Sequence, residues 1–138
     1  MKKLLLILLF SFFGSFPEAT DYYGTLTMNP NTTKEYSLEN IRVTLLPDNE
    51  NNKATLVLHR VKFSRMMPVR VNVRIPDVTT SFSNGKLALS GNGIVPVNGA
   101  NEHLERMVTN LGGSAVECQL SFKMKMGGIP MVYKGRSH

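Results

Sequence analysis

Apolar and polar residues alternate along two segments of the chain. Residues 69–75 place valine or isoleucine at every second position, with arginine and asparagine between them. Residues 117–126 show the same alternation, and its apolar positions are Cys118, Leu120, Phe122, Met124 and Met126. A period of two puts successive side chains on opposite faces of a β-strand. Both segments are therefore predicted to be strands with one buried face, and Cys118 is predicted to be a buried, unreactive thiol.

Weaker alternation marks further short strands in residues 41–45, 54–59 and 87–89, the last after an Asn84-Gly85 turn. Clusters rich in Asn, Gly, Pro and Asp separate these segments at short intervals. Asn-Gly is a strong hairpin signal, and about eight strands at this spacing are typical of an all-β sandwich or barrel. The alternation fits both architectures equally, because each has one apolar face per strand.

Residues 101–111 depart from the strand pattern. Their apolar side chains recur at three- and four-residue spacing: Leu104, Met107, Val108 and Leu111. Asn101 is a candidate N-cap, and Gly112-Gly113 follows as a stop signal. This segment is predicted to be one short helix or a loop, and the fold to contain at most one short helix.

The first residues have the layout of a signal peptide. Lys2-Lys3 precedes ten apolar or small residues ending at Phe13, and Gly14-Ser15 follows. Such a run is too short to span a membrane. Residues 1–20 are predicted to be removed by cleavage between Gly14 and Thr20, which leaves one domain over residues 21–138. Because no cysteine lies near that boundary, the product is expected in the periplasm or outside the cell, not as a lipoprotein and without stable membrane insertion.

The chain is basic, and its positive charge limits the kinds of partner that it can bind. The formal net charge is +6, and most of this excess remains when residues 1–20 are removed. A positive surface is compatible with acidic glycans or anionic lipid. Export and the lack of a basic run interleaved with aromatic residues argue against a nucleic-acid partner. None of these features indicates an oligomeric state.

The titratable residues do not form a recognisable catalytic motif. His59 lies on the polar side of its strand and is predicted to be a solvated surface residue. His103 stands beside Glu102 and Glu105, either as a metal ligand or, as we favour, on a charged surface. Gly91-Asn92-Gly93 lacks the further spaced glycine of a nucleotide-binding loop. We therefore predict no catalytic residues, no metal site, no cofactor and no enzyme activity.

Several short segments resemble one known family. They are Tyr23-Gly24-Thr25-Leu26-Thr27, residues 54–58 with 61–63, Met67-Pro68-Val69, Ile75-Pro76-Asp77-Val78 and residues 126–135. Their order is similar to that in the calycin-like, lipocalin-related β-barrel domains of small exported proteins from gut Bacteroidetes. The resemblance implies an exported protein with a single antiparallel eight-stranded barrel, and it decides between barrel and sandwich.

These observations lead to two functional hypotheses. The first is an exported binding module that carries a small apolar ligand in the barrel interior. The interior residues predicted to line that site are Leu56, Leu58, Val71, Val73, Leu120, Phe122 and Met124. The alternative is a barrel packed by those side chains that acts through its surface, on a glycan, a protease or an outer-membrane partner. The outward-facing Arg70, Arg74, Lys123 and Lys125 are predicted to form a basic, solvated outer surface.

Overall fold

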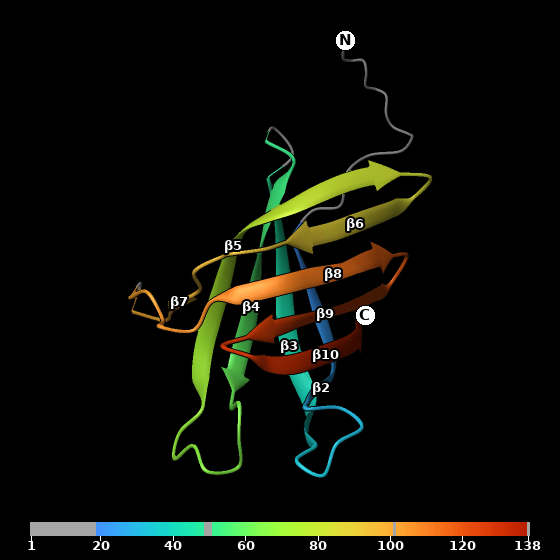
Figure 1. The fold of residues 1–138 in the computed structure, drawn as a ribbon. Helices are drawn as coiled ribbons and strands as arrows, with labels where there is room; N and C mark the ends of the chain where they lie inside the picture. Colours follow the sequence, from blue (N-terminus) through green and yellow to red (C-terminus); the bar gives the residue numbers. More distant parts are fainter. Residues whose placement is uncertain (1–18, 49–50, 101, 138) are drawn as a thin grey trace.

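The computed structural model describes residues 19–48, 51–100 and 102–137, and in them the chain is built from β-strands without a helix (Figure 1). The expected signal peptide lies almost wholly outside these residues. The strands are β2 (Thr20–Met28), β3 (Tyr36–Asp48), β4 (Lys53–Val61), β5 (Val71–Ser83), β6 (Lys86–Gly91), β7 (Val97–Asn98), β8 (Val108–Val116), β9 (Gln119–Met126) and β10 (Ile129–Arg136).

Eight of these strands close into one antiparallel barrel, which confirms the predicted architecture. Each strand of the ring pairs with the next one along the chain, and β10 pairs with β2 to close it. The short strand β7 pairs with β5 and lies outside the ring. This up-and-down order is the connectivity of lipocalin barrels. Closure leaves none of the eight strands with the fully unpaired edge that would recruit another chain.

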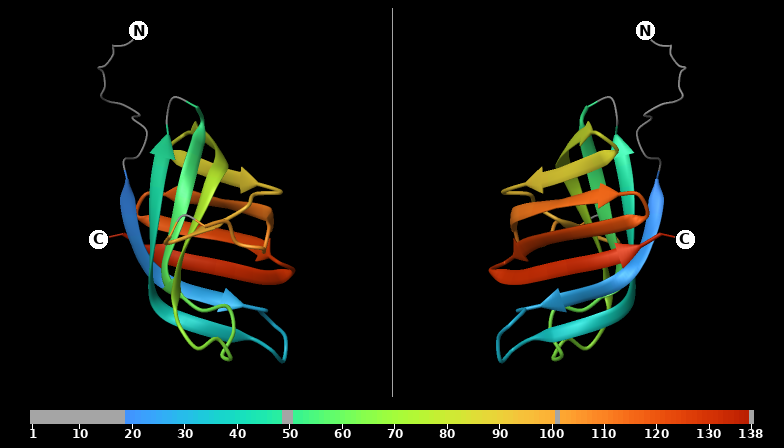
Figure 2. Two further views of the ribbon diagram at one scale, coloured as in Figure 1. Left: turned by 90° about the vertical axis from the view of Figure 1, so that its left-hand side faces the viewer. Right: turned by 90° about the vertical axis from the view of Figure 1, so that its right-hand side faces the viewer.

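The barrel is flattened into two layers that cross at a large angle (Figure 2). Strands β2 and β3 belong to both layers, since they curve from the direction of β4 into the direction of β10. Their pairing shifts register between Gly24 and Leu26, opposite Asn40, which has a φ of 56°. Strand β5 has a comparable irregularity at Asp77, with a φ of 59°. β-Bulges of this kind bend a strand and let it turn a corner between layers.

Of the short helix and the loop predicted for residues 101–111, the loop is found over part of the segment, and the described residues contain no helix there. Residues 102–107 form a loop, and Val108 to Leu111 belong to β8, paired with β9. The pairing of β8 with β9 shifts register between Thr109 and Gly112, and Asn110 has a φ of 54°. This bulge turns both Val108 and Leu111 inward although they are three residues apart. A bulged strand has therefore reproduced the apolar spacing of a helix.

The strand predicted over residues 69–75 begins later than expected. Strand β5 starts at Val71, and Val69 lies in the preceding loop with 62% of its surface exposed. In the sequence the β-branched alternation begins at Val69. Pairing of β5 with β4, however, reaches only as far as the pair formed by Val61 and Val71.

Cys118 is exposed, which corrects its predicted burial. Val116 pairs with Gln119, so that Glu117 and Cys118 form a two-residue turn between β8 and β9. Glu117 takes the left-handed conformation of this turn, with a φ of 54°. The period-two pattern runs through the turn in the sequence, but the strand on which Leu120 and Phe122 face inward begins only at Gln119.

The exposed thiol predicts rapid chemical labelling. We expect Cys118 of the folded protein to react with a disulfide reagent such as DTNB at nearly the rate of the unfolded chain, because its turn position leaves the sulfur accessible. Absorbance traces recorded with and without denaturant check this. A native rate slower by a hundredfold would show that the turn is covered in solution.

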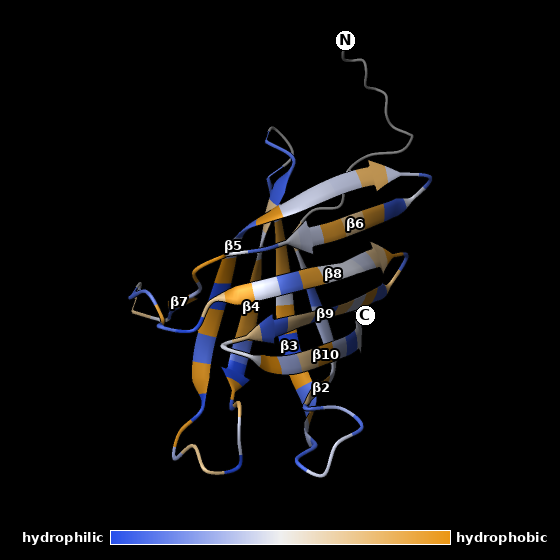
Figure 3. Ribbon diagram, viewed as in Figure 1, coloured by the Kyte–Doolittle hydropathy of each residue, from blue (hydrophilic) through white to orange (hydrophobic). Residues whose placement is uncertain are grey.

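The barrel interior is filled by apolar side chains from all eight strands of the ring. Apolar and polar residues alternate along β9, as Figure 3 shows. Tyr133 is the bulkiest of the fully buried side chains, and its ring stacks on Phe122 with centroids 5.3 Å apart. The Tyr133 hydroxyl donates a hydrogen bond of 2.9 Å to the carbonyl of Ile41, which directly follows the bulge residue Asn40 in β3. Burial raises the pKa of Tyr133 above its ordinary value.

Candidate functional site

The structure brings the residues of the predicted interior site together in the core. Leu56, Leu58 and Val73 are 0% exposed. Leu120, Phe122 and Met124 are at most 3% exposed. Val71 is half-buried at the start of β5 and packs against the same cluster. All seven side chains therefore belong to one apolar cluster.

A row of outward-facing residues crosses four neighbouring strands on the outside of the barrel. Tyr23 on β2 is the Cα partner of Arg136 on β10 and of Arg42 on β3. Arg136 in turn pairs with Gln119 on β9. All four side chains are exposed, since they share the outward parity of their strands. We call Arg136, Tyr23 and Arg42 the arginine–tyrosine row.

Tyr23 separates two hollows in this outer surface. The first has a volume of about 550 Å³ and is lined by Tyr23, Gln119, Leu120, Ser121, Lys134, Gly135 and Arg136. The second has a volume of about 320 Å³ and is lined by Tyr23, Asn40, Ile41, Arg42, His59, Arg60 and Arg70. Together their linings contain five lysine or arginine side chains and no carboxylate. Asp21 lies two residues before Tyr23 on the same face of β2, but its carboxylate already accepts a hydrogen bond from Thr44.

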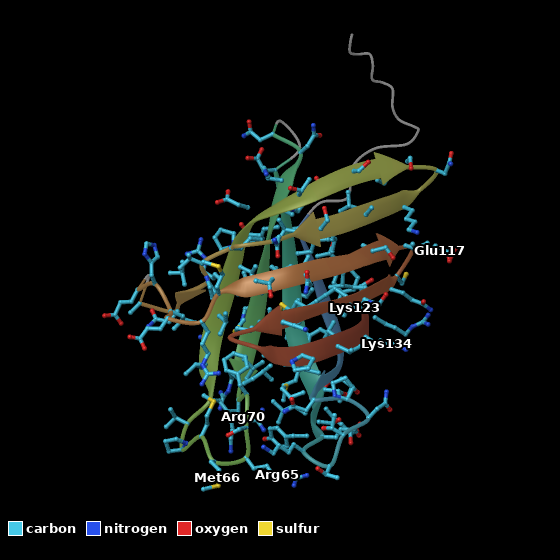
Figure 4. The ribbon with its side chains drawn as sticks, in the orientation of Figure 1. Arg65, Met66, Arg70, Glu117, Lys123 and Lys134 are labelled. Atoms are coloured by element: carbon cyan, nitrogen blue, oxygen red, sulfur yellow. The ribbon has the colours of Figure 1, made fainter. Side chains whose placement is uncertain are left out.

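A third groove continues the first hollow across β8, β9 and β10. It has a volume of about 310 Å³, shares Ser121 and Lys134 with the first hollow, and also contains Lys123 and Gly112. Figure 4 shows Lys123 and Lys134 on the outside of these neighbouring strands. Gly112 has no side chain to fill the groove.

The predicted basic surface of Arg70, Arg74, Lys123 and Lys125 is exposed but is not one patch. Arg70 lines the second hollow, whereas Lys123 lines the third groove with Lys134. Arg74 lies on β5, which β6 and β8 separate from the β9 strand of Lys125. The predicted set lacked the arginine–tyrosine row, because only strand register shows that its three residues are neighbours.

His59 is half-buried and hydrogen-bonded, not fully solvated as predicted. The Arg42 Nη2 atom lies 3.2 Å from His59 Nδ1, and Thr44 Oγ1 lies 2.8 Å from His59 Nε2. Because arginine only donates and a carboxylate only accepts, the chain of donation runs from Arg42 through His59 and Thr44 to Asp21. His59 is then neutral, with its proton on Nε2. Burial and the Arg42 charge lower the pKa of His59, and Asp21 opposes them.

This network predicts a pH dependence for the outer surface. In the unfolded chain the His59 imidazole has its ordinary pKa of about 6.5. The folded protein binds this proton more weakly. The stabilisation from neutral His59 is therefore complete above that pH and is lost as the pH falls through the lower, folded pKa. NMR titration of the imidazole should give a midpoint below 6.5, and Arg42→Gln should raise it. A wild-type midpoint at or above the unfolded value would contradict the assigned network.

His103 is exposed in the loop before β8, where it forms a bridge with Val97. In the part of the chain that the structure describes, no group of three His, Cys, Asp or Glu side chains is placed to hold a metal ion. Nor do these described residues include a helix that could cross a membrane.

Comparisons with known proteins show a similarity in fold and none in sequence family. No protein-family model matches the chain, and no curated protein matches it in sequence. One solved structure with a similar fold is a "putative outer membrane protein" from Bacteroides fragilis, with a TM-score of 0.58 and 16% identity. The match covers 86% of this chain and 50% of that protein, so this chain corresponds to about half of its neighbour's length. The β-barrel architecture is thus shared with a protein from Bacteroides.

Proposed function

We propose that this protein is an exported, calycin-related β-barrel that binds an acidic partner on the outside of strands β10, β2, β3 and β4. The observation that carries the proposal is the composition of the two hollows beside Tyr23. They present Lys134, Arg136, Arg42, Arg60 and Arg70 without a carboxylate in either lining. A concave surface of one sign concentrates ligands of the opposite sign and speeds their association.

The packing of the interior supports a surface role over that of a ligand carrier. Sites for small ligands have volumes of about 300–1,000 Å³ and are lined mainly by apolar side chains. The side chains predicted to line such a site are packed into the core, and the buried Tyr133 hydroxyl is held there by the Ile41 carbonyl. Eight strands form a barrel just wide enough for its side chains to fill.

Two observations support export. The fold neighbour from Bacteroides fragilis is described as a "putative outer membrane protein", which fits a location in the cell envelope. Strand β2 begins at Thr20, directly after the expected cleavage region, and Thr20 pairs with Leu45. Cleavage after Ala19 would therefore leave the first strand of the barrel intact.

Titration with labelled polyglutamate and polylysine tests the sign of the partner. At low salt, polyglutamate should bind saturably and be released as salt rises, whereas polylysine should not bind. Arg42→Glu and Arg136→Glu should each weaken polyglutamate binding at least fivefold. The control is Lys34→Glu, which makes the same change in net charge in the loop between β2 and β3, outside both hollows. An equal loss in the control would show that only net charge matters and would refute the proposed surface.

A fluorescent fatty acid tests the carrier hypothesis on the same protein. We expect no saturable signal at micromolar protein, because the interior is occupied by its own side chains. Saturable binding that lipid extract displaces would instead favour the apolar-ligand carrier.

A further inference from the structure

We propose that the arginine–tyrosine row binds a linear acidic polysaccharide, a chain of sugars bearing carboxylate or sulfate groups. The inference rests on the proposed function, since it names the partner of the same outer surface. It goes further by assigning recognition to three residues, Arg136, Tyr23 and Arg42.

The spacing within the row suits a charged sugar chain. Neighbouring strands lie about 4.8 Å apart, so the Cα atoms of Arg136 and Arg42 stand roughly 10 Å apart, with Tyr23 between them. Tyr23 is 36% exposed, which leaves ring surface on which the C–H face of a sugar can pack. The planar guanidinium on each side can bind a carboxylate or sulfate through two parallel hydrogen bonds.

Basic residues continue in both directions from the row, which favours an extended ligand. On one side Lys134 belongs to both the first hollow and the third groove, and Lys123 lies further along that groove. On the other side Arg60 and Arg70 line the second hollow. A linear polymer of acidic sugars could contact these cations in succession, because the depressions adjoin, with Tyr23 between the two hollows and Lys134 between the first hollow and the third groove.

The polar groups beside the row favour a saccharide over other polyanions. Gln119 and Asn40, one in each hollow, supply amide groups that can both donate to and accept from sugar hydroxyls. Tyr23 is the one aromatic residue in the linings of the two hollows. Proteins that bind single-stranded nucleic acid stack successive bases on several aromatic side chains, and the single Tyr23 does not provide such a series.

Binding measured by fluorescence anisotropy tests the inference on the folded protein. The probes are labelled oligogalacturonate and heparin oligosaccharides, with neutral dextran, polyglutamate and single-stranded DNA of similar length for comparison. We expect an acidic oligosaccharide to bind more tightly than the other probes. Tyr23→Ser should lower its affinity at least tenfold, and Arg42→Gln and Arg136→Gln several-fold each. Lys34→Gln, in the loop between β2 and β3 and outside all three depressions, should change it by less than twofold, with thermal melts confirming that every variant folds.

The outcomes separate this inference from the proposed function. If polyglutamate or DNA binds as tightly as the oligosaccharides and Tyr23→Ser has no effect, the saccharide assignment is overturned while the acidic-partner function stands. If oligosaccharides bind but the row variants match Lys34→Gln, the location is overturned. If no acidic polymer binds at low salt, both proposals fail.

Discussion

Val73→Asp should abolish folding of the barrel. Val73 is 0% exposed on the inner face of β5, within the main apolar core. An aspartate there must bury a charge among apolar side chains or bind a proton, and either costs several kcal/mol. Domains of this size have a total stability of about 5–15 kcal/mol. Circular dichroism of the purified variant should show loss of the strand signal and of a cooperative melt.

The matched control is Val69→Asp, which makes the same chemical change four residues earlier. Val69 lies in a loop and is 62% exposed, so its replacement should change stability by less than about 0.5 kcal/mol. Comparable losses in the two variants would contradict the burial of Val73 in the core or the exposure of Val69 in its loop.

Gly113→Ala should destabilise the barrel by about 3 kcal/mol or more, a large effect for one methyl group. A Cβ atom at Gly113 would stand 2.2 Å from the Ser121 carbonyl oxygen and 2.5 Å from the Phe122 Cα. Both are backbone atoms of β9, which pairs with β8 at this point, so the strands must separate to make room. Denaturant unfolding monitored by circular dichroism should show a lower midpoint.

The neighbouring glycine provides the control. A Cβ atom at Gly112 would meet no other atom within 4 Å. Gly112→Ala should therefore leave stability unchanged or raise it slightly, because alanine restricts the unfolded chain. If Gly113→Ala were as stable as Gly112→Ala, the close approach of β8 and β9 would be refuted.

Alternation in the sequence was enough to predict parts of β3, β4, β5, β6 and β9 and which of their side chains point inward, whereas β2, β8 and β10 were not predicted from it. Leu56, Leu58 and Val73 follow that parity and are buried. Parity failed where the backbone changed it locally, at the bulge around Asn110 and at the turn formed by Glu117 and Cys118. The residues with a positive φ at these two sites are Asn110 and Glu117 and not glycines, although asparagine is among the residue types that tolerate a positive φ.

The outer surface could not be predicted in the same way. Tyr23, Arg42 and Arg136 come from three strands, and Arg136 is more than a hundred residues from Tyr23 in the chain. Their alignment depends on the stagger with which β10 closes onto β2, which the hydrophobic pattern does not encode. The requirement for glycine at position 113 could not be predicted either, because it comes from the close approach of the partner strand β9.

The pairing of β10 with β2 also governs how the barrel is made. Met131 must find Met28, and Arg136 must find Tyr23, across almost the whole length of the domain. Contacts between residues so distant in sequence slow folding, because the chain must first lose the entropy of a long loop. Until β10 is available, β2 and β9 each keep an open edge. Assembly of this barrel is therefore expected to be slow and to finish at its C-terminal strand, and a chaperone that shields those two edges would protect it meanwhile.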